Sequence, residues 1–249
     1  MCSWLSSVRS WACLLAGLVV GSAMAQVSEH RLKLSTHELP PYSSQLAGSP
    51  GGIAVTVVRC AARRMNLALE IEFVPWARAQ LHAQEGLSDG FFAASQSDAR
   101  DAYAQLSEVI APQQWRWYFR VDARLRPGSS EFRRAARVTS FLGANMMDWL
   151  IAQGYRTETA PTDTAALLRM LQQGRVDAVL ANQLVMEHLL ATRSDGTSLQ
   201  SQLALDKPLG VYLTRRFLAQ RPPDFMTRFN AAVLACRPAE EPRGKAAKH

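Results

Sequence analysis

The chain has 249 residues, 48% of them hydrophobic and 20% charged, and a formal net charge of +7 at pH 7. Its basic residues are mostly Arg and are scattered along the chain. A nucleic-acid-binding surface needs them clustered in a stripe, so we expect no nucleic-acid partner. A positive net charge does favour anionic ligands.

Residues 1–25 are predicted to be a cleavable export signal. Arg9 is their only charge, residues 11–20 form an apolar stretch, and Ala23-Met24-Ala25 is a small-residue cleavage site. The stretch is shorter than the roughly 20 residues of a membrane-spanning helix. We therefore expect the mature chain to begin at Gln26 and to be located in the periplasm.

Cys60 and Cys236 are the two cysteines that remain after the signal is removed. An even number in an oxidising compartment favours a disulfide between them, and two buried free thiols are the alternative. Neither has a second Cys or a His nearby at metal-ligand spacing, so we expect no metal site.

The first half of the chain alternates between expected strands and helices. In chain order we expect a strand at 32–36, a turn-rich loop at 48–52, a helix at 53–65, a strand at 69–74, a helix from 76, a strand ending near 94 and an extended aromatic segment at 115–120. The β-branched run at 55–58 weakly favours a strand in place of the helix around it.

A similar unit occurs twice, at residues 81–94 and 169–181. In both copies a helix ends at a glycine, an Asp follows three residues later (Asp89 and Asp177), and a short apolar run comes next. Glycine just past a helix supplies the left-handed cap, and the apolar run indicates a buried strand. The repeat predicts two α/β lobes with a cleft between them, and its aspartates are expected to bind turn amides rather than ligand.

The second half of the chain repeats the strand–helix alternation after a Pro/Gly/Ser-rich linker at 122–130. We expect strands at 137–141, 157–160, 177–181 and 210–214, helices at 145–153, 164–173, 184–192 and 223–234, and a disordered basic tail from 237. This alternation predicts mostly parallel sheets, whose ligands bind at the carboxyl ends of the strands.

The candidate ligand-binding residues stand at those strand ends and at the start of one helix. They are Glu38, Tyr42, Trp76, Ser95, Arg100, Asn145 and Asn182. One cation, several neutral hydrogen-bonding groups and aromatic faces indicate a binding site for a small polar or anionic ligand. Arginine suits a carboxylate because its planar fork pairs bidentately, and the backbone N–H groups at the helix start near Asn145 also favour anions.

Each candidate also has a structural alternative. Arg100 would pair with the neighbouring Asp98 or Asp101, and Trp76 would belong to the core. The remaining alternatives are a helix cap for Asn182 and solvated loop positions for Glu38 and Tyr42.

Signals for catalysis are poor, so we expect neither an enzyme nor a cofactor. The sequence has no phosphate-binding loop and no His-Glu-x-x-His motif. His37 and Glu38 could do acid–base chemistry, but neighbours on a strand point to opposite faces.

A series of short motifs covers nearly all of residues 31–236. They are Pro-Pro-Tyr at 40–42, Gly51-Gly52, Pro75-Trp76-Ala77-Arg78-Ala79, Gly86-x-x-Asp89-Gly90, Arg100 followed by Ser107, Gly174-Arg175-Val176-Asp177-Ala178, and Phe229-Asn230-Ala231-Ala232. In order and spacing they resemble the periplasmic solute-binding proteins of polar amino acid ABC transporters. That resemblance implies the α/β type II fold with two lobes, called the Venus flytrap.

The resemblance also implies roles for single residues. Arg100 would hold the carboxylate of the ligand, Trp76 would stack on the ligand, and Gly143-Ala144-Asn145 would be the binding loop of the second lobe. The family's usual Asp for the α-amine of the ligand is replaced by Asn182. Either Glu38 supplies the missing charge, or the ligand is a different small carboxylate.

The expected organisation is a first lobe from 26–119 and 208–236 and a second lobe from 120–207. Hinge closure would occur near 118–121 and 206–211, and a Cys60–Cys236 bond would stay within the first lobe. The implied function is that of a monomeric, non-enzymatic receptor that delivers an amino-acid-like carboxylate to an ABC permease of the inner membrane. A flytrap-derived dehydratase or lyase and a stand-alone ligand sensor are the alternatives.

Overall fold

The computed structural model describes residues 31–46, 48–192 and 198–238. The export signal expected at 1–25 and all but the first two residues of the tail expected from 237 lie outside these residues. Within them, no helix is both long enough and apolar enough to cross a membrane.

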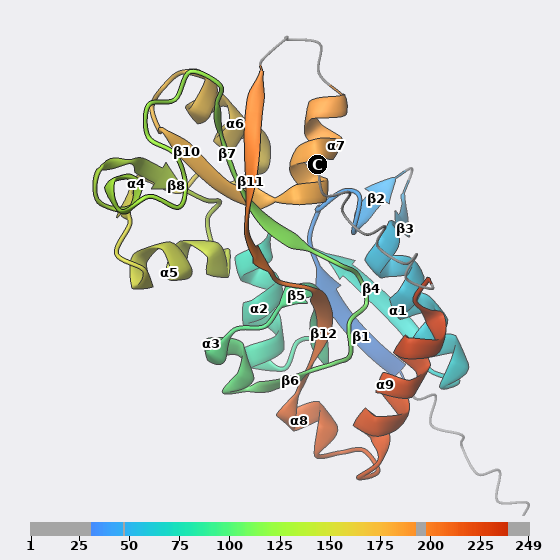
Figure 1. The fold of residues 1–249 in the computed structure, drawn as a ribbon. Helices are drawn as coiled ribbons and strands as arrows, with labels where there is room; N and C mark the ends of the chain where they lie inside the picture. Colours follow the sequence, from blue (N-terminus) through green and yellow to red (C-terminus); the bar gives the residue numbers. More distant parts are fainter. Residues whose placement is uncertain (1–30, 47, 193–197, 239–249) are drawn as a thin grey trace, which may run out of the picture.

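The chain forms two lobes, each built around a five-stranded sheet (Figure 1). The sheet of the first lobe has the strand order β4-β1-β5-β12-β6, and that of the second lobe has the order β11-β7-β10-β8-β9. The elements of the first lobe are β1 (Arg31–Thr36), β2 (Ser44–Leu46), β3 (Ser49–Gly51), α1 (Ile53–Arg64), β4 (Ala68–Phe73), α2 (Trp76–Glu85), β5 (Gly90–Ser95), α3 (Asp98–Asp101), β6 (Ala104–Leu106), β12 (Leu209–Thr214), α8 (Arg215–Leu218) and α9 (Phe225–Cys236). The elements of the second lobe are β7 (Gln114–Arg120), α4 (Ser130–Ala135), β8 (Arg137–Thr139), α5 (Asn145–Ala152), β9 (Arg156–Thr157), α6 (Thr164–Gln172), β10 (Ala178–Asn182), α7 (Gln183–Ala191) and β11 (Leu199–Asp206).

Both sheets are mixed, with parallel and antiparallel pairs of strands. The parallel pairs are β1 with β4 and β5, and β8 with β9 and β10. The strands that lead into or out of a lobe, β7, β11 and β12, pair antiparallel with their neighbours. The expected mixed α/β fold with flanking helices is confirmed, and the antiparallel pairs belong to the crossing strands, which are not part of a strand–helix–strand repeat.

The crossing into the second lobe comes earlier than a boundary at 119/120. β7 pairs with β10 and β11 along its whole length, beginning at Gln114. The extended aromatic segment at 115–120 therefore belongs to the second sheet, and the first crossing lies between Ala111, which bridges to Leu209, and Gln114. The return crossing joins β11, which ends at Asp206, to β12, which begins at Leu209.

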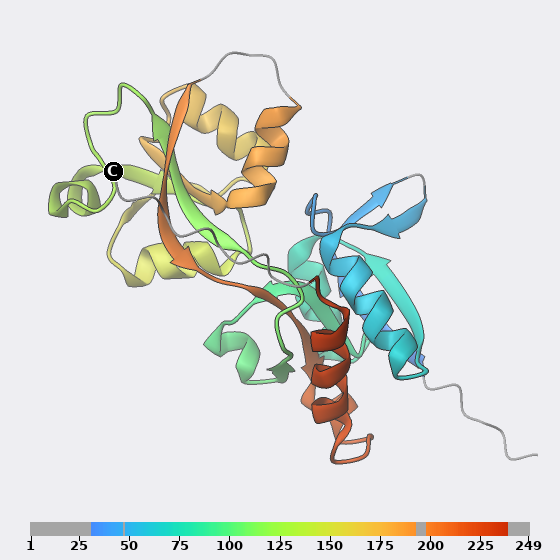
Figure 2. The same cartoon turned by 45° about the vertical axis from the view of Figure 1, so that its right-hand side comes forward.

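Two helices at the outside of the first lobe are fastened together. Helix α1 packs against helix α9, and the two lie side by side in Figure 2. Cys60 of α1 and Cys236 of α9 are bonded in the structure, with 5.8 Å between their Cα atoms. Both cysteines belong to the first lobe, so the bond does not cross the cleft.

The repeated Gly-x-x-Asp unit has the same structural role in both lobes. Asp89 Oδ2 accepts the backbone N–H of Lys33 at 2.7 Å, and Asp177 Oδ2 accepts that of Arg137 at 2.8 Å. In return, the N–H of each Asp donates to the carbonyl of the same partner residue. The aspartates are thus structural, as expected, but they bind the amide of the adjacent strand instead of a turn amide.

The Pro-Pro-Tyr motif supports the start of α1. The N–H of Ile53 donates to Pro41 O at 3.0 Å, and the N–H of Ala54 donates to Tyr42 O at 2.9 Å. These N–H groups have no partner inside a helix, so the motif supplies partners from outside. Gly52 directly precedes Ile53 and has φ 109°, a conformation that favours glycine.

Candidate functional site

The lobes enclose a small cavity, which we call the inner chamber. It holds about 290 Å³ of space, part of it open to solvent. The residues that line it are His37, Leu39, Trp76, Ala93, Ala94, Ser95, Arg100, Gln113, Trp115, Phe141, Ala144, Asn145, Met146, Asn182 and Leu209. The segments after β1, β5, β8 and β10 all contribute, so the strand ends expected from the sequence meet here.

The end of β5 is irregular where it reaches the chamber. The register between β5 and β12 shifts between Gly210 and Val211, opposite Ala93. Ala93 has φ 60°, unusual for a residue with a side chain. Bulges of this kind occur next to binding sites, where they redirect the end of a strand, and here the redirected end carries Ser95.

Among the described residues, Arg100 is the only charged one that lines the chamber when His37 is neutral, and it is 4% exposed. Its Nε donates to Gln80 Oε1 and its Nη1 donates to Ser95 O, both at 2.9 Å. Within the described part of the chain, Nη2 makes no hydrogen bond and the guanidinium forms no ion pair. A local pair with Asp98 or Asp101 is therefore not what the structure contains.

The charge of Arg100 is only partly offset by its surroundings. Burial lowers the pKa of the guanidinium, while Tyr212, Tyr103, Asp148 and Asp101 act in the opposite direction. A buried cation without a carboxylate partner is costly unless something else pairs with it. The guanidinium is therefore suited to receive a carboxylate inside the chamber.

Three aromatic rings form a wall along one side of the chamber. The ring centroids of His37 and Trp76 are 4.6 Å apart, and those of His37 and Phe141 are 6.4 Å apart. The guanidinium of Arg100 lies over the Trp76 ring, 5.0 Å from its centroid. Trp76 is both part of a core cluster and part of the chamber lining, so its two sequence interpretations are compatible.

The second lobe reaches across to the first through Asn145. Its Nδ2 donates to Ser95 Oγ and to Gln96 O, both at 3.1 Å. The neighbouring loop residue Gly143 also approaches the first lobe, since a Cβ placed on it would lie 3.6 Å from Cδ1 of Trp76. The structure thus brings together three of the candidate ligand-binding residues, Asn145, Ser95 and Trp76.

Asn182 lies at the start of α7, but its side chain makes no capping hydrogen bond. It is 6% exposed, it lines the chamber, and its Oδ1 has no hydrogen-bond partner. The alternative role of this side chain as a helix cap is therefore not the one in the structure.

Two expected site residues do not line the chamber. Tyr42 is fully buried in the core of the first lobe, and its hydroxyl donates to Pro112 O at 2.9 Å. Glu38 points away from the chamber, and its Oε1 accepts the N–H of Gln45 at 2.7 Å. Tyr42 is therefore neither a site residue nor a solvated loop residue, because its side chain is part of the core of the first lobe.

A second hollow, which we call the outer groove, lies on the far side of the aromatic wall. It consists of two spaces of about 1090 and 1000 Å³, open to solvent, that share the lining residues His37, Glu38, Phe141, Thr162 and Asp163. Its carboxylates, Glu38 and Asp163, are separated from Arg100 by His37 and Phe141.

Sequence reasoning missed several lining residues, chiefly Gln113, Trp115, Phe141 and His37. Gln113 lies in the first crossing and Trp115 near the start of β7, and both were missed because the crossing was placed too late in the chain. Phe141 was placed at the end of a strand that in fact stops at Thr139. His37 was considered only as a base paired with Glu38. Neighbouring residues of a strand point to opposite faces, and this was the signal that His37 faces the chamber when Glu38 does not.

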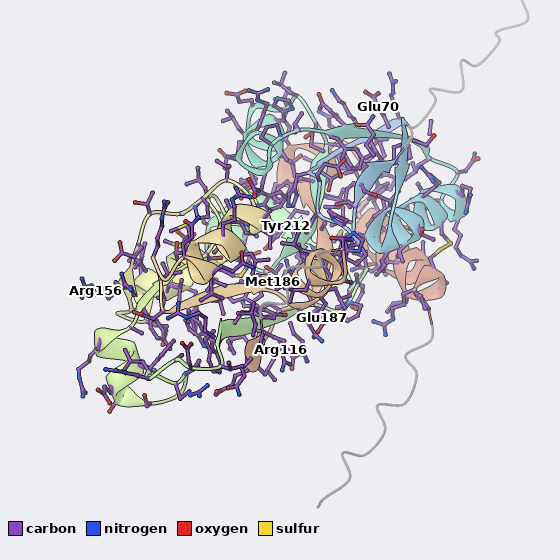
Figure 3. The ribbon with its side chains drawn as sticks, turned by 90° about the horizontal axis from the view of Figure 1, so that it is seen from above. Glu70, Arg116, Arg156, Met186, Glu187 and Tyr212 are labelled. Atoms are coloured by element: carbon purple, nitrogen blue, oxygen red, sulfur yellow. A yellow bond between two sulfur atoms is a disulfide. The ribbon has the colours of Figure 1, made fainter. Side chains whose placement is uncertain are left out.

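Figure 3 shows the molecule from above, with Glu70 and Arg156 near opposite ends and Tyr212 between them. Tyr212 is fully buried, and its hydroxyl donates to Asp101 Oδ1 at 2.7 Å. Asp101 Oδ2 also accepts from Gln96 Nε2 at 2.6 Å. The carboxylate closest along the chain to Arg100 is thus held by other partners.

No family model matches the sequence, and no curated protein matches it in a sequence comparison. Solved structures do match the fold. Holo ArgBP from T. maritima has a TM-score of 0.68 and 16% identity, over 86% of this chain and 93% of that one. The GluR0 ligand-binding core from Nostoc punctiforme, in complex with L-glutamate, has a TM-score of 0.67 and 16% identity, over 82% and 92%.

A third match is the substrate-binding protein of an amino acid ABC transporter, with a TM-score of 0.64 and 12% identity over 82% of this chain and 92% of that one. These proteins are amino-acid-binding by name, and the chain spans almost their whole length. At this level of identity the likeness concerns the fold, which is the two-lobed α/β type II periplasmic-binding fold.

Proposed function

We propose that this chain is a solute-binding protein of the periplasm that captures a small polar carboxylate, amino-acid-like in size, between its lobes and delivers it to an ABC permease of the inner membrane. The observation that carries the proposal is the Arg100 guanidinium, buried in the interlobe chamber and without a carboxylate partner among the described residues. A ligand carboxylate would supply that partner through bidentate hydrogen bonds.

The rest of the chamber is consistent with binding rather than catalysis. Its walls combine aromatic rings with a few convergent polar groups, the usual composition of a small-molecule site. The fold neighbours whose names include bound arginine or L-glutamate support a ligand of similar size. The Arg100 role implied by the family resemblance agrees with this geometry.

The test is whether Arg100→Ala abolishes ligand-induced thermal stabilisation. The ligand is first identified by mass spectrometry of the small molecules released from the gently isolated protein, and then added back in a thermal shift assay. We expect stabilisation of the wild-type protein, none for Arg100→Ala, and a strong reduction for Arg100→Lys, because an ammonium cannot reproduce the planar fork.

Arg78→Ala is the matched control, since it removes an exposed arginine from the same helix that carries Trp76. It should leave the stabilisation unchanged. Binding retained by Arg100→Ala would contradict the assignment. Recovery of a chemically altered ligand after incubation would favour the dehydratase or lyase alternative, and association with a signalling protein in place of a permease would favour the sensor.

A further inference from the structure

Positive charge predominates around the inner chamber, and this determines which charged groups of a ligand it can accept. The described residues that line it include one permanent cation, Arg100, and no Asp or Glu. A second cation stands close by, because Lys207 Nζ lies 5.6 Å from the centroid of the Trp115 ring and within 3.5 Å of Gln96 O. A carboxylate would be well placed here, and a further positive charge would not.

Two neutral side chains in the lining have unpaired polar atoms. Within the part of the chain that the structure describes, Asn182 Oδ1 has no hydrogen-bond partner, and neither Nδ1 nor Nε2 of His37 has one. Asn182 is 6% exposed and His37 is 8% exposed, so bulk water does not surround them. Buried polar atoms in folded proteins are nearly always hydrogen-bonded to protein or to ordered water, so these atoms are free to bind a ligand or the water that it displaces.

The unpaired atoms of these two residues can both be hydrogen-bonded by one ligand group that donates and accepts. A neutral imidazole has one N–H donor and one acceptor nitrogen, and the Asn side chain offers an oxygen acceptor and an amide donor. A hydroxyl can accept from one of them and donate to the other. An ammonium can only donate, and it also brings a positive charge.

The nearby carboxylates do not line the chamber, and most of them already hold other partners. Asp148, whose charge acts on Arg100, is exposed on α5. Glu38 lies beyond the aromatic wall and holds the N–H of Gln45. Asp101 is held by Tyr212 and Gln96. Asp163 lies in the outer groove, where its Oδ1 caps α6 by accepting the N–H of Ala166 at 2.7 Å.

We propose that the inner chamber selects a small 2-hydroxycarboxylate over the 2-amino acid of the same skeleton, with the carboxylate at Arg100 and the hydroxyl between His37 and Asn182. The proposal rests on the proposed function, because it assumes that Arg100 holds a carboxylate. Charge distinguishes the two classes of ligand. A 2-hydroxy acid has no ammonium, whereas the amino acid of the same skeleton brings an ammonium for which the described lining has no acidic partner.

The test uses three matched pairs in isothermal titration calorimetry with the refolded, ligand-free protein. The pairs are L-lactate with L-alanine, L-malate with L-aspartate, and L-2-hydroxyglutarate with L-glutamate. In the pair that binds best, we expect the hydroxy acid to have a Kd at least tenfold lower than that of the amino acid. Asn182→Asp should reduce or reverse this ratio, because its carboxylate would pair with the ammonium and repel an anionic ligand.

Gln183→Glu is the control, since it adds the same charge at the next position, outside the chamber lining. It should leave the ratio of the two Kd values within about twofold of wild type. Equal or tighter binding of an amino acid by the wild-type protein would overturn the inference, and so would the failure of every hydroxy acid to bind. If amino acids bind and Arg100→Ala abolishes their binding, the proposed function stands and only the hydroxyl preference fails.

Discussion

At the residue scale, the neutral imidazole of His37 determines how the cleft should respond to pH. Burial, and secondly the positive charge of Arg100, lower the pKa of His37 to about 3. The rings packed against it, Trp76 and Phe141, carry no charge. His37 should therefore stay neutral across the range in which histidines usually titrate.

We accordingly predict that affinity for a fully ionised carboxylate changes less than about twofold between pH 5 and pH 8. Isothermal titration calorimetry across this range measures it, with His37→Phe as the control for all other titrating groups. A loss or gain of affinity with a midpoint near 6.5, present in the wild-type protein and absent from His37→Phe, would contradict the prediction.

His37 also makes the stability of the folded protein sensitive to acid. Its pKa is lower in the folded than in the unfolded chain, so the unfolded chain binds the proton more readily. The resulting loss of stability begins as the pH falls below the ordinary value of about 6.5 and continues down to the folded value of about 3.

Tyr42 and Glu38 show what residue patterns could not determine about the site. Both follow the first strand and have polar groups suited to binding, yet one is core and the other faces the outer groove. Burial of Tyr42 depends on its contact with the crossing segment at Pro112, 70 residues away. No local pattern contains that contact.

At the element scale, the start of helix α1 depends on the absence of a side chain at Gly52. A Cβ at this position would lie 2.5 Å from Tyr42 O and 2.8 Å from Pro41 O. These are the two carbonyls that accept the first N–H groups of the helix. The residue also has φ 109°, which a side chain would strain.

We predict that Gly52→Ala lowers the free energy of unfolding by about 1–3 kcal/mol, measured by urea denaturation. The adjacent Gly51→Ala is the matched control, because a Cβ there would meet nothing within 4 Å and its φ is not in the left-handed region. Equal stability of the two variants would contradict the role assigned to Gly52.

Most elements could be predicted from the sequence, but strand β11 could not. The helices α1, α5, α6, α7 and α9 lie where apolar periodicity placed them, within a few residues at each end. Strand β11 was missed because its sequence, Leu199–Asp206, is largely polar and its residues are mostly exposed. It is held by backbone pairing with β7, which side-chain pattern does not report.

At the scale of the whole molecule, direct hydrogen bonds join the two lobes. Asn145 Nδ2 joins the second lobe to Ser95 and Gln96 of the first. A hydrogen bond of this kind contributes about 0.5–1.5 kcal/mol, enough to shift a balance between open and closed arrangements.

We predict that Asn145→Ala shifts the ligand-free protein toward an open arrangement and weakens ligand binding by up to about tenfold. Small-angle X-ray scattering should show a larger radius of gyration than for the wild-type protein. Ile151→Ala, a change at an exposed position of the same helix, should leave it unchanged. An unchanged radius for Asn145→Ala would mean that these bonds do not hold the lobes together.

The sequence by itself determined that the chain is α/β and has two similar lobes, because apolar periodicity and the glycine that ends each repeated helix act over a few residues. It also placed Arg100, Ser95, Asn145 and Asn182 at strand ends or at the start of a helix. Only the tertiary structure decided which strand-end side chains face the chamber and which crossing residues complete it. His37 faces Arg100 while Glu38 faces away, since adjacent residues alternate between faces and the packing of one lobe against the other selects the face.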